Sequence, residues 1–315
     1  MIFRDRRIRD KLEEMERGQR EQNEKAALLA ALSIRNENRR QEKISSLAAI
    51  EFSVSSQWGE DGILDWLIER TPGLQPVFVE IGTQDYRESN TRYLLQNRNW
   101  TGFIFEGNEE DVRAVQASSV AWRHDLRIRQ AFVTRENIQS LLQSQDVPAE
   151  TGLLSLDIDG NDYWVWEAIE EIRPGLVVLE YNSCFGDLLP LTVPYQPDFR
   201  RSPSLGGNIY FGASIQAMIH LSQKKGYEFL GTGSNGCNSY FIRKDLAPHV
   251  VPRIGARTFH CAKFTEGRGA MQELLFLRGK KQAEMIESMP VINLLDGKEC
   301  ILGKLPYHSP TWFSA

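Results

Sequence analysis

The segment 153–164, LLSLDIDGNDYW, joins an apolar run to a cluster of acids. Apart from one serine the first four residues are apolar, which is typical of a strand buried on both faces of a parallel sheet. Three acids follow within six positions, separated by Ile158, Gly160 and Asn161: Asp157, Asp159 and Asp162. In an open sheet of this kind, ligands bind beyond the carboxyl ends of the strands. The segment therefore predicts a buried strand that ends at a functional site.

Similar apolar runs occur on both sides of this segment and alternate with amphipathic stretches. We expect strands at 77–81, 102–106, 128–133, 153–157 and 176–180. Helices are expected between them, at 59–70, 90–98, 108–116, 136–145 and 162–171. After residue 211, a helix that ends at Gly226 precedes two strands joined by a polar turn. This order predicts an α/β fold, an open and mostly parallel doubly wound sheet that ends in an antiparallel hairpin.

The composition divides the chain into three parts. Residues 1–46 are charged, contain no proline and form a predicted helical arm, which is either a solvated helix or an oligomerisation or docking arm that pairs copies of the chain. Residues 47–246 form the predicted catalytic domain, and residues 247–315 form an extension packed on it, helical at 271–285. Within the domain, residues 183–210 are rich in proline, glycine and serine. A connection of that length predicts a lid or binding loop.

The overall composition excludes some classes of function. A net charge of -5 argues against nucleic acid as a partner, which usually needs a basic face. No apolar stretch reaches the roughly 18 residues of a membrane span, and the first residues lack an apolar signal region. The four cysteines are widely separated, which argues against a disulfide framework or a zinc site. We expect a cytoplasmic protein with free thiols.

Acidic and polar residues follow the predicted strands and collect at one edge of the sheet. Glu106 ends the second strand, where a carboxylate accepts the two hydroxyls of a ribose in nucleotide-binding sheets. The first turn, EIGTQDY, contains one glycine and lacks the three-glycine pattern that grips a diphosphate. The pattern therefore favours a nucleoside without a diphosphate, such as S-adenosylmethionine.

The motifs at these strand ends resemble those of the class I S-adenosylmethionine-dependent methyltransferases, and the FkbM-like branch in particular. The similar stretches lie within 53–245 and include EIGTQDY, FIFEGN, VTREN, LLSLDIDGNDYWVW and VVLEYN, together with SSQWGEDGIL before the first strand. The resemblance implies methyl transfer to a hydroxyl of a sugar, glycan or small natural product. On this basis the candidate cofactor-binding residues are Glu80, Gly82, Asp85, Asn90, Glu106, Gly107, Thr134 and Asp157.

The acids after the fourth and fifth strands also predict a metal site. Neighbouring parallel strands lie about 4.8 Å apart, so groups at their ends converge. Carboxylate and amide oxygens suit Mg²⁺ or Mn²⁺, and the candidate ligands are Asp157, Asp159, Glu180 and Asn182. Asp157 and Asp159 are also the candidate catalytic residues, with Asp159 as a general base. Asp162 is expected to stabilise the start of the next helix.

Two other functions fit parts of this pattern. The Asp157-x-Asp159 pair is also the motif by which many glycosyltransferases hold Mn²⁺ against a nucleotide sugar. Alternatively, the chain is a non-catalytic module of the same fold that oligomerises through residues 1–46. Binding of a nucleotide sugar would favour the first alternative, and the lack of any cofactor binding would favour the second.

Overall fold

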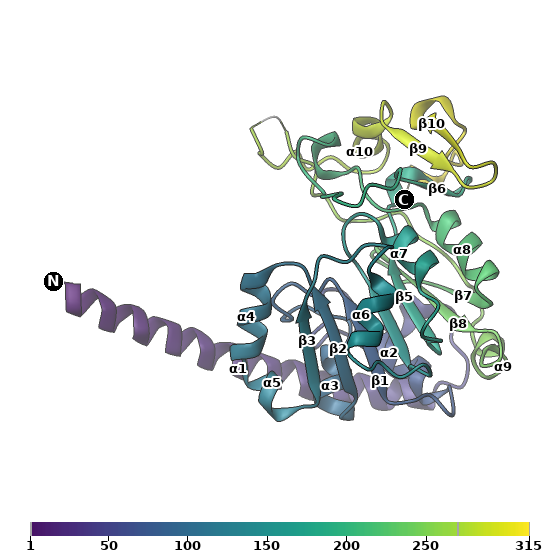
Figure 1. Ribbon diagram of the computed structural model, residues 1–315. Coiled ribbons are helices and arrows are strands. Elements are labelled where there is room, and N and C mark those ends of the chain that lie inside the picture. Colours follow the sequence, from purple (N-terminus) through teal and green to yellow (C-terminus); the bar gives the residue numbers. More distant parts are fainter. Residues whose placement is uncertain (1, 270, 315) are drawn as a thin grey trace.

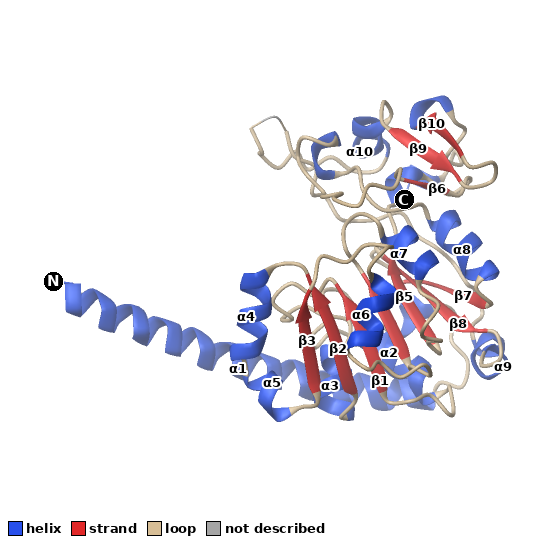
Figure 2. Cartoon of the chain, viewed as in Figure 1, coloured by secondary structure: helices blue, strands red, loops and turns tan. Residues whose placement is uncertain are grey.

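A seven-stranded sheet forms the centre of the protein (Figure 2), which is described by a computed structural model covering residues 2–269 and 271–314. The strand order is β3-β2-β1-β4-β5-β8-β7, and β8 runs in the direction opposite to the other six strands of this sheet. The strands are β1 Val77–Ile81, β2 Thr101–Glu106, β3 Leu126–Gln130, β4 Leu153–Leu156, β5 Leu176–Glu180, β7 Tyr227–Thr232 and β8 Asn238–Arg243. The predicted fold is confirmed: a Rossmann-like, mostly parallel sheet that closes with an antiparallel hairpin.

Helices cover both faces of this sheet and bury two separate apolar clusters. Alternate residues of a strand point to opposite faces, so Phe78 packs with α2 and α3 while Val79 packs with α6, α7 and α8. Asn108 caps α4 by accepting a hydrogen bond from the Glu110 N–H, as its position predicts. The α-helices of the domain and its extension are α2 Glu60–Glu69, α3 Arg92–Arg98, α4 Glu109–Ala117, α5 Ser119–Arg123, α6 Ile138–Ser144, α7 Asp162–Ala168, α8 Ile215–Lys224, α9 Ala247–Val250 and α10 Lys280–Ala283. Short 3₁₀ turns lie at Leu47–Ile50, Ser183–Phe185, Gly206–Asn208, Val251–Arg253, Glu284–Ile286, Leu302–Lys304 and Trp312–Ser314.

The first helix, α1 (Ile2–Arg40), extends away from the domain at its N-terminal end (Figure 1). Its 39 residues span about 58 Å at 1.5 Å per residue. Leu12, Met15 and Leu29 are exposed on it, with relative exposures of 53%, 64% and 69%. Pairing of two copies through residues 1–46 stays a prediction.

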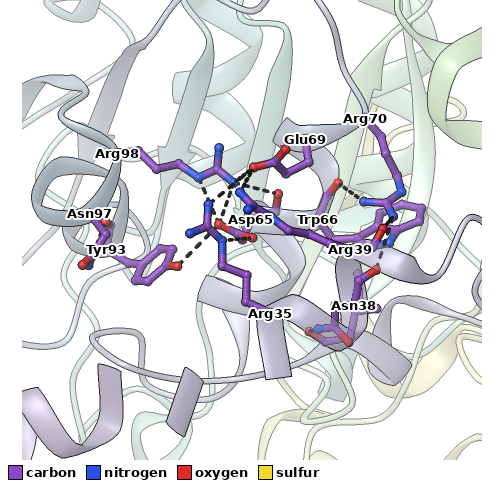
Figure 3. Close-up of polar contacts among 11 residues, drawn as sticks. Arg35, Asn38, Arg39, Asp65, Trp66, Glu69, Arg70, Tyr93, Asn97 and Arg98 are labelled. Atoms are coloured by element: carbon purple, nitrogen blue, oxygen red, sulfur yellow. Dashed lines mark hydrogen bonds and ion pairs between the residues drawn. The ribbon is translucent and has the colours of Figure 1, made fainter. Parts of the chain in front are cut away.

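The other end of α1 is fixed to the domain by a buried ion-pair network (Figure 3). Asp65 of α2 has a side chain only 3% exposed and accepts from Arg35 of α1 at 3.0 Å and from Arg98 of α3 at 2.6 Å. Asn38 donates to the carbonyl oxygen of Ile50 at 2.9 Å. The last turns of α1 therefore belong to the packed domain, although the start of the helix leaves it.

The C-terminal extension folds back over one end of the domain and forms a small second sheet. Its strands are β9 Pro290–Asn293 and β10 Lys298–Ile301, and β9 pairs with β6 Leu191–Thr192 from the long connection after β5. The Trp312 indole N–H donates to the carbonyl oxygen of Ser183 at 2.9 Å. The extension and the 183–210 segment therefore share one core.

Two predicted elements need correction. The helix predicted at 271–285 is wrong except for α10 and the 3₁₀ turn after it, because Gln272, Phe276 and Gly279 all have positive φ angles that a helix does not accept. The third strand begins at Leu126, earlier than predicted, and the apolar residues 131–133 leave it to form a cavity wall. In the described part of the chain, no helix has an apolar stretch long enough to cross a membrane.

Candidate functional site

A cavity of about 460 Å³ lies at the carboxyl ends of the parallel strands. It lies where the strand order reverses between β1 and β4, the usual position of ligands in such sheets. Loops after β1, β2, β3, β4 and β5 line it, together with residues from the 183–210 segment and the C-terminal extension. Most of the residues predicted for the site line this cavity: Glu80, Gly82, Asn90, Glu106, Gly107, Asp157, Asp159 and Glu180.

The loops after β1 and β4 touch at Gly82. This residue has a φ of +80°, and a Cβ atom there would lie 1.7 Å from the carbonyl oxygen of Asp157. Only glycine allows such an approach without moving one of the two loops. The Asp157 N–H also donates to the carbonyl oxygen of Ile81 at 3.0 Å. Gly82 therefore sets the distance between the two sides of the cavity.

Glu80 organises the floor of the cavity. Its buried carboxylate accepts from the Ser89 hydroxyl at 2.6 Å, from the Thr91 hydroxyl and from the Asn90 N–H at 3.0 Å. The side chain of Asn90 in turn donates to the hydroxyl of Ser155 on β4 at 3.1 Å. Burial raises the pKa of Glu80 to about 7 despite these hydrogen bonds. Glu80 thus fixes the chain between β1 and α3.

Glu106 lies at the end of β2, as predicted, but it is already engaged with the protein. One carboxylate oxygen, Oε2, accepts from the N–H groups of Thr83 and Gln84 at 2.9 and 2.8 Å. The other, Oε1, accepts from the Asn108 N–H at 2.8 Å. Of the two oxygens, Oε1 keeps the greater free capacity for a ribose hydroxyl. The first loop therefore closes onto Glu106 through Thr83 and Gln84.

Three of the predicted residues do not line the cavity. Asp85 pairs with Arg87 at 3.2 Å, and Thr134 exchanges hydrogen bonds with Asn137 at the start of α6. The Asn182 amide donates to the carbonyl oxygens of Ile209 and Phe211 and accepts from the Cys184 N–H. All these hydrogen bonds are to backbone groups, and they hold the long segment after β5 in place. The structure therefore does not place Asn182 among metal ligands.

Asp157, Asp159 and Glu180 meet as predicted for a cation site. One oxygen from each lies within 4.8 Å of the others. Burial first, and then the nearby charges of Asp159 and Asp162, raise the pKa of Asp157 well above its ordinary value. Burial and the charges of Asp157 and Asp159 raise the pKa of Glu180 in the same way. The Oε2 atom of Glu180 is buried without a hydrogen-bond partner.

The loop that carries Asp159 is held in an uncommon conformation. Asp159 has a φ of +54°, in the left-handed region that few residues other than glycine adopt. Asp162 accepts from the N–H groups of Ile158 and Gly160 at 2.8 and 3.0 Å and so supports the loop from below. Its role is structural, and the Asp159 carboxylate, 42% exposed, is left facing the cavity.

The C-terminal extension brings a further acid, Glu266, to the cavity, which the sequence pattern did not predict. Arg201 pairs with Asp159 at 2.5 Å and with Glu266 at 2.6 Å, and its guanidinium lies 4.0 Å from the ring centre of Phe211. No pattern around Glu266 marks it as a site residue, since it lies in an irregular segment. Arg201 lies in the 183–210 segment, whose composition alone suggests a solvated side chain. The Arg201 side chain is nevertheless only 13% exposed.

Comparisons with known proteins identify similar folds only. No protein-family model matches the chain, and no curated protein matches it. The N-terminal domain of EvdMO1 with S-adenosylhomocysteine (SAH) bound is 12% identical with a TM-score of 0.39, covering 60% of this chain and 82% of that one. An S-adenosylmethionine-dependent methyltransferase from Clostridium acetobutylicum ATCC 824 is 8% identical with a TM-score of 0.38, covering 58% and 90%.

A third structure, magnesium protoporphyrin IX methyltransferase from Synechocystis PCC 6803 with bound S-adenosylmethionine, is 11% identical with a TM-score of 0.37. It covers 58% of this chain and 77% of that one. These similarities are too low to support an argument about chemistry. None of them identifies the FkbM-like branch, and the fold assignment rests on the strand order itself.

Proposed function

We propose that this protein is an S-adenosylmethionine-dependent methyltransferase that methylates a hydroxyl oxygen with the help of a divalent cation. The observation that carries the proposal is the combination of one cavity at the β1/β4 switch point with three converging carboxylates on its wall. Glu106 and Gly82, which we assign to the cofactor, line that cavity. The sheet order, with β8 antiparallel between β5 and β7, supports the same class.

The residues at the acidic cluster fit Mg²⁺ or Mn²⁺. The oxygens of Asp157, Asp159 and Glu180 are hard ligands at a suitable spacing, and Glu180 Oε2 has no hydrogen-bond partner among the described residues. Without a cation or a shared proton, carboxylates at this separation repel one another. A bound cation would lower the pKa of an acceptor hydroxyl and so favour its oxyanion.

The chain's own residues then position the reaction. The half-exposed Asp159 carboxylate faces the cavity and is oriented by Arg201, so it is placed to take the proton of the acceptor hydroxyl. The oxygen attacks the methyl carbon while the bond from that carbon to the sulfonium sulfur breaks. Phe199, Phe264 and Glu266 close the outer side of the cavity. Exclusion of water and alignment of the two reactants account for most of the expected rate enhancement.

The class of methyl acceptor is inferred from the resemblance of the sequence motifs and from the residues that line the cavity opposite the strand ends. We infer a small hydroxyl-bearing acceptor, a sugar, a glycan or a natural product, bound between the 183–210 segment and the C-terminal extension. Arg200 lies over the ring of Phe132 at 4.6 Å and lines the same wall. Together with Phe199 and Phe264 it offers a flat, partly apolar surface for such a molecule.

Calorimetric titration with SAH tests the cofactor assignment. We expect saturable binding that Glu106→Gln weakens, while Glu110→Gln, an exposed glutamate on α4, leaves it unchanged. Repeating the titration with Mn²⁺ before and after EDTA tests the cation, and Asp159→Asn should abolish the metal response. Lack of SAH binding in the folded wild-type protein would refute the proposal, and nucleotide sugars would then be tested with Mn²⁺.

A further inference from the structure

Three residues that line the cavity each have a buried oxygen atom without a hydrogen-bond partner in the described part of the chain. These atoms are Oε2 of Glu180, Oδ1 of Asn238 and Oδ1 of Asn161. The two asparagines are 7% and 4% exposed. A buried acceptor without a partner destabilises the protein, so three in one cavity call for a ligand. Because all three atoms are acceptors, that ligand carries positive charge or hydrogen-bond donors.

Asn238 is placed beside the acidic cluster by the pairing of β5 and β8. Glu180 and Asn238 lie directly opposite each other in this antiparallel pair. Residues in that relation have their side chains on the same face of the sheet, with Cβ atoms about 4.5–5.5 Å apart. The side chains of Asn238 and Glu180 are therefore neighbours at the carboxyl end of β5.

The orientation of the Asn238 amide is set by Glu60. The Asn238 NH₂ group donates to Glu60 Oε1 at 3.0 Å. Glu60 Oε2 accepts from the N–H groups of Trp58 and Gly59 at 3.0 and 2.8 Å, which holds the carboxylate in place. Since a carboxylate only accepts, the amide must turn its NH₂ group toward Glu60 and leave Oδ1 without that partner.

We propose that Asn238 is a further binding residue of the cation site and that Glu60 is its positioning residue. Asn238 Oδ1 supplies the amide oxygen that the sequence pattern assigned to Asn182. The occupant is a hard divalent cation bound with Asp157, Asp159 and Glu180, because amide and carboxylate oxygens together suit that class of ion. This inference rests on the cation assignment of the proposed function.

Titration of the full-length protein with Mn²⁺, followed by the electron paramagnetic resonance signal of the free ion, tests the inference. Asn238→Ala should weaken Mn²⁺ binding about tenfold or more, whereas Asn238→Asp, which keeps an oxygen, should retain it. Glu60→Gln should weaken it about tenfold, because a glutamine no longer fixes the amide. Asn235→Ala is the matched control. Asn235 lies in the turn before β8 and is as buried as Asn238, but it does not line the cavity.

The outcomes separate this inference from the proposed function. If Asp159→Asn abolishes Mn²⁺ binding while Asn238→Ala and Asn238→Asp both bind like Asn235→Ala, the inference is overturned and the cation site stands. If the wild-type protein does not bind Mn²⁺, the cation assignment fails and the inference fails with it, whether or not SAH binds. Urea unfolding of each variant shows whether it folds. If Asn238→Ala does not fold, the Mn²⁺ affinity of Glu60→Gln tests the inference instead.

Discussion

Replacing Glu80 by glutamine should remove part of the pH dependence of stability. This carboxyl is buried at the end of β1, and its three donors are the hydroxyls of Ser89 and Thr91 and the N–H of Asn90. Burial raises its pKa from an ordinary value of 4.5 to about 7. A glutamine has nearly the same shape and accepts through its own oxygen, but it does not titrate.

The magnitude follows from the linkage between proton binding and folding. A rise of about 2.5 pH units is worth about 3 kcal/mol at about 1.4 kcal/mol per unit. Because the folded state binds this proton more tightly than the unfolded state, the stabilisation is fully present below pH 4.5. It is lost as the pH rises through about 7. The free energy of unfolding should therefore fall by up to about 3 kcal/mol between pH 4.5 and 8 on account of Glu80.

Urea unfolding followed by tryptophan fluorescence between about pH 5 and 8 measures this change. Asp61 and Asp162, whose pKa values burial raises to about 6, contribute in the same direction in both proteins. The difference between wild type and Glu80→Gln isolates the share of Glu80, and exposed Glu110→Gln serves as the control. Parallel pH curves for wild type and Glu80→Gln would refute the reasoning, since they would mean that Glu80 has the same pKa in both states.

The remaining predictions concern the arm, the cavity and its arginine. Asp65→Asn should lower the free energy of unfolding by up to about 3 kcal/mol, because it leaves the largely buried Arg35 and Arg98 with Glu69 as their remaining carboxylate partner; urea unfolding measures this. Gly82→Ala should weaken SAH binding in calorimetry, since its Cβ atom would displace the Asp157 loop, and unchanged affinity would contradict that geometry. Arg201→Met should tighten Mn²⁺ binding by removing a positive charge beside Asp159, and weaker binding would show instead that Arg201 mainly orients the carboxylate.

Most of the sheet could be predicted because its strands are short, mostly apolar and alternate with amphipathic helical stretches. The pattern fails where burial is supplied from far along the chain. The pair β6 and β9 joins Leu191 to Asn293, and neither stretch has the alternation of an isolated strand. The segment 271–285 has helix-forming residues, but positive φ angles at Gln272 and Phe276 break it. In both the β6/β9 pair and the segment 271–285, tertiary contacts override the secondary-structure propensity of the local sequence.

The sequence predicted the positions of residues at strand ends, but it did not predict positions that depend on tertiary contacts. Asp157 and Glu180 end neighbouring parallel strands, so their convergence follows from topology alone. Asn182 has the right residue type, but its amide is used by the backbone of Ile209 and Phe211. The sequence alone does not mark Asn238, because its proposed role depends on the pairing of β8 with β5, which places it opposite Glu180.

The stretch LLSLDIDGNDYW contains two kinds of acid, and their hydrogen bonds tell them apart. Asp162 is buried and accepts from two backbone N–H groups, so its charge is compensated within the loop that it supports. Asp157 faces Glu180 and Asp159, and burial together with the charges of Asp159 and Asp162 raises its pKa. An acid that stabilises a loop has donors of its own, whereas this cluster holds more acceptors than donors. Bound protons or a ligand must compensate for that excess of acceptors. For this reason we expect the catalytic site at the end of β4.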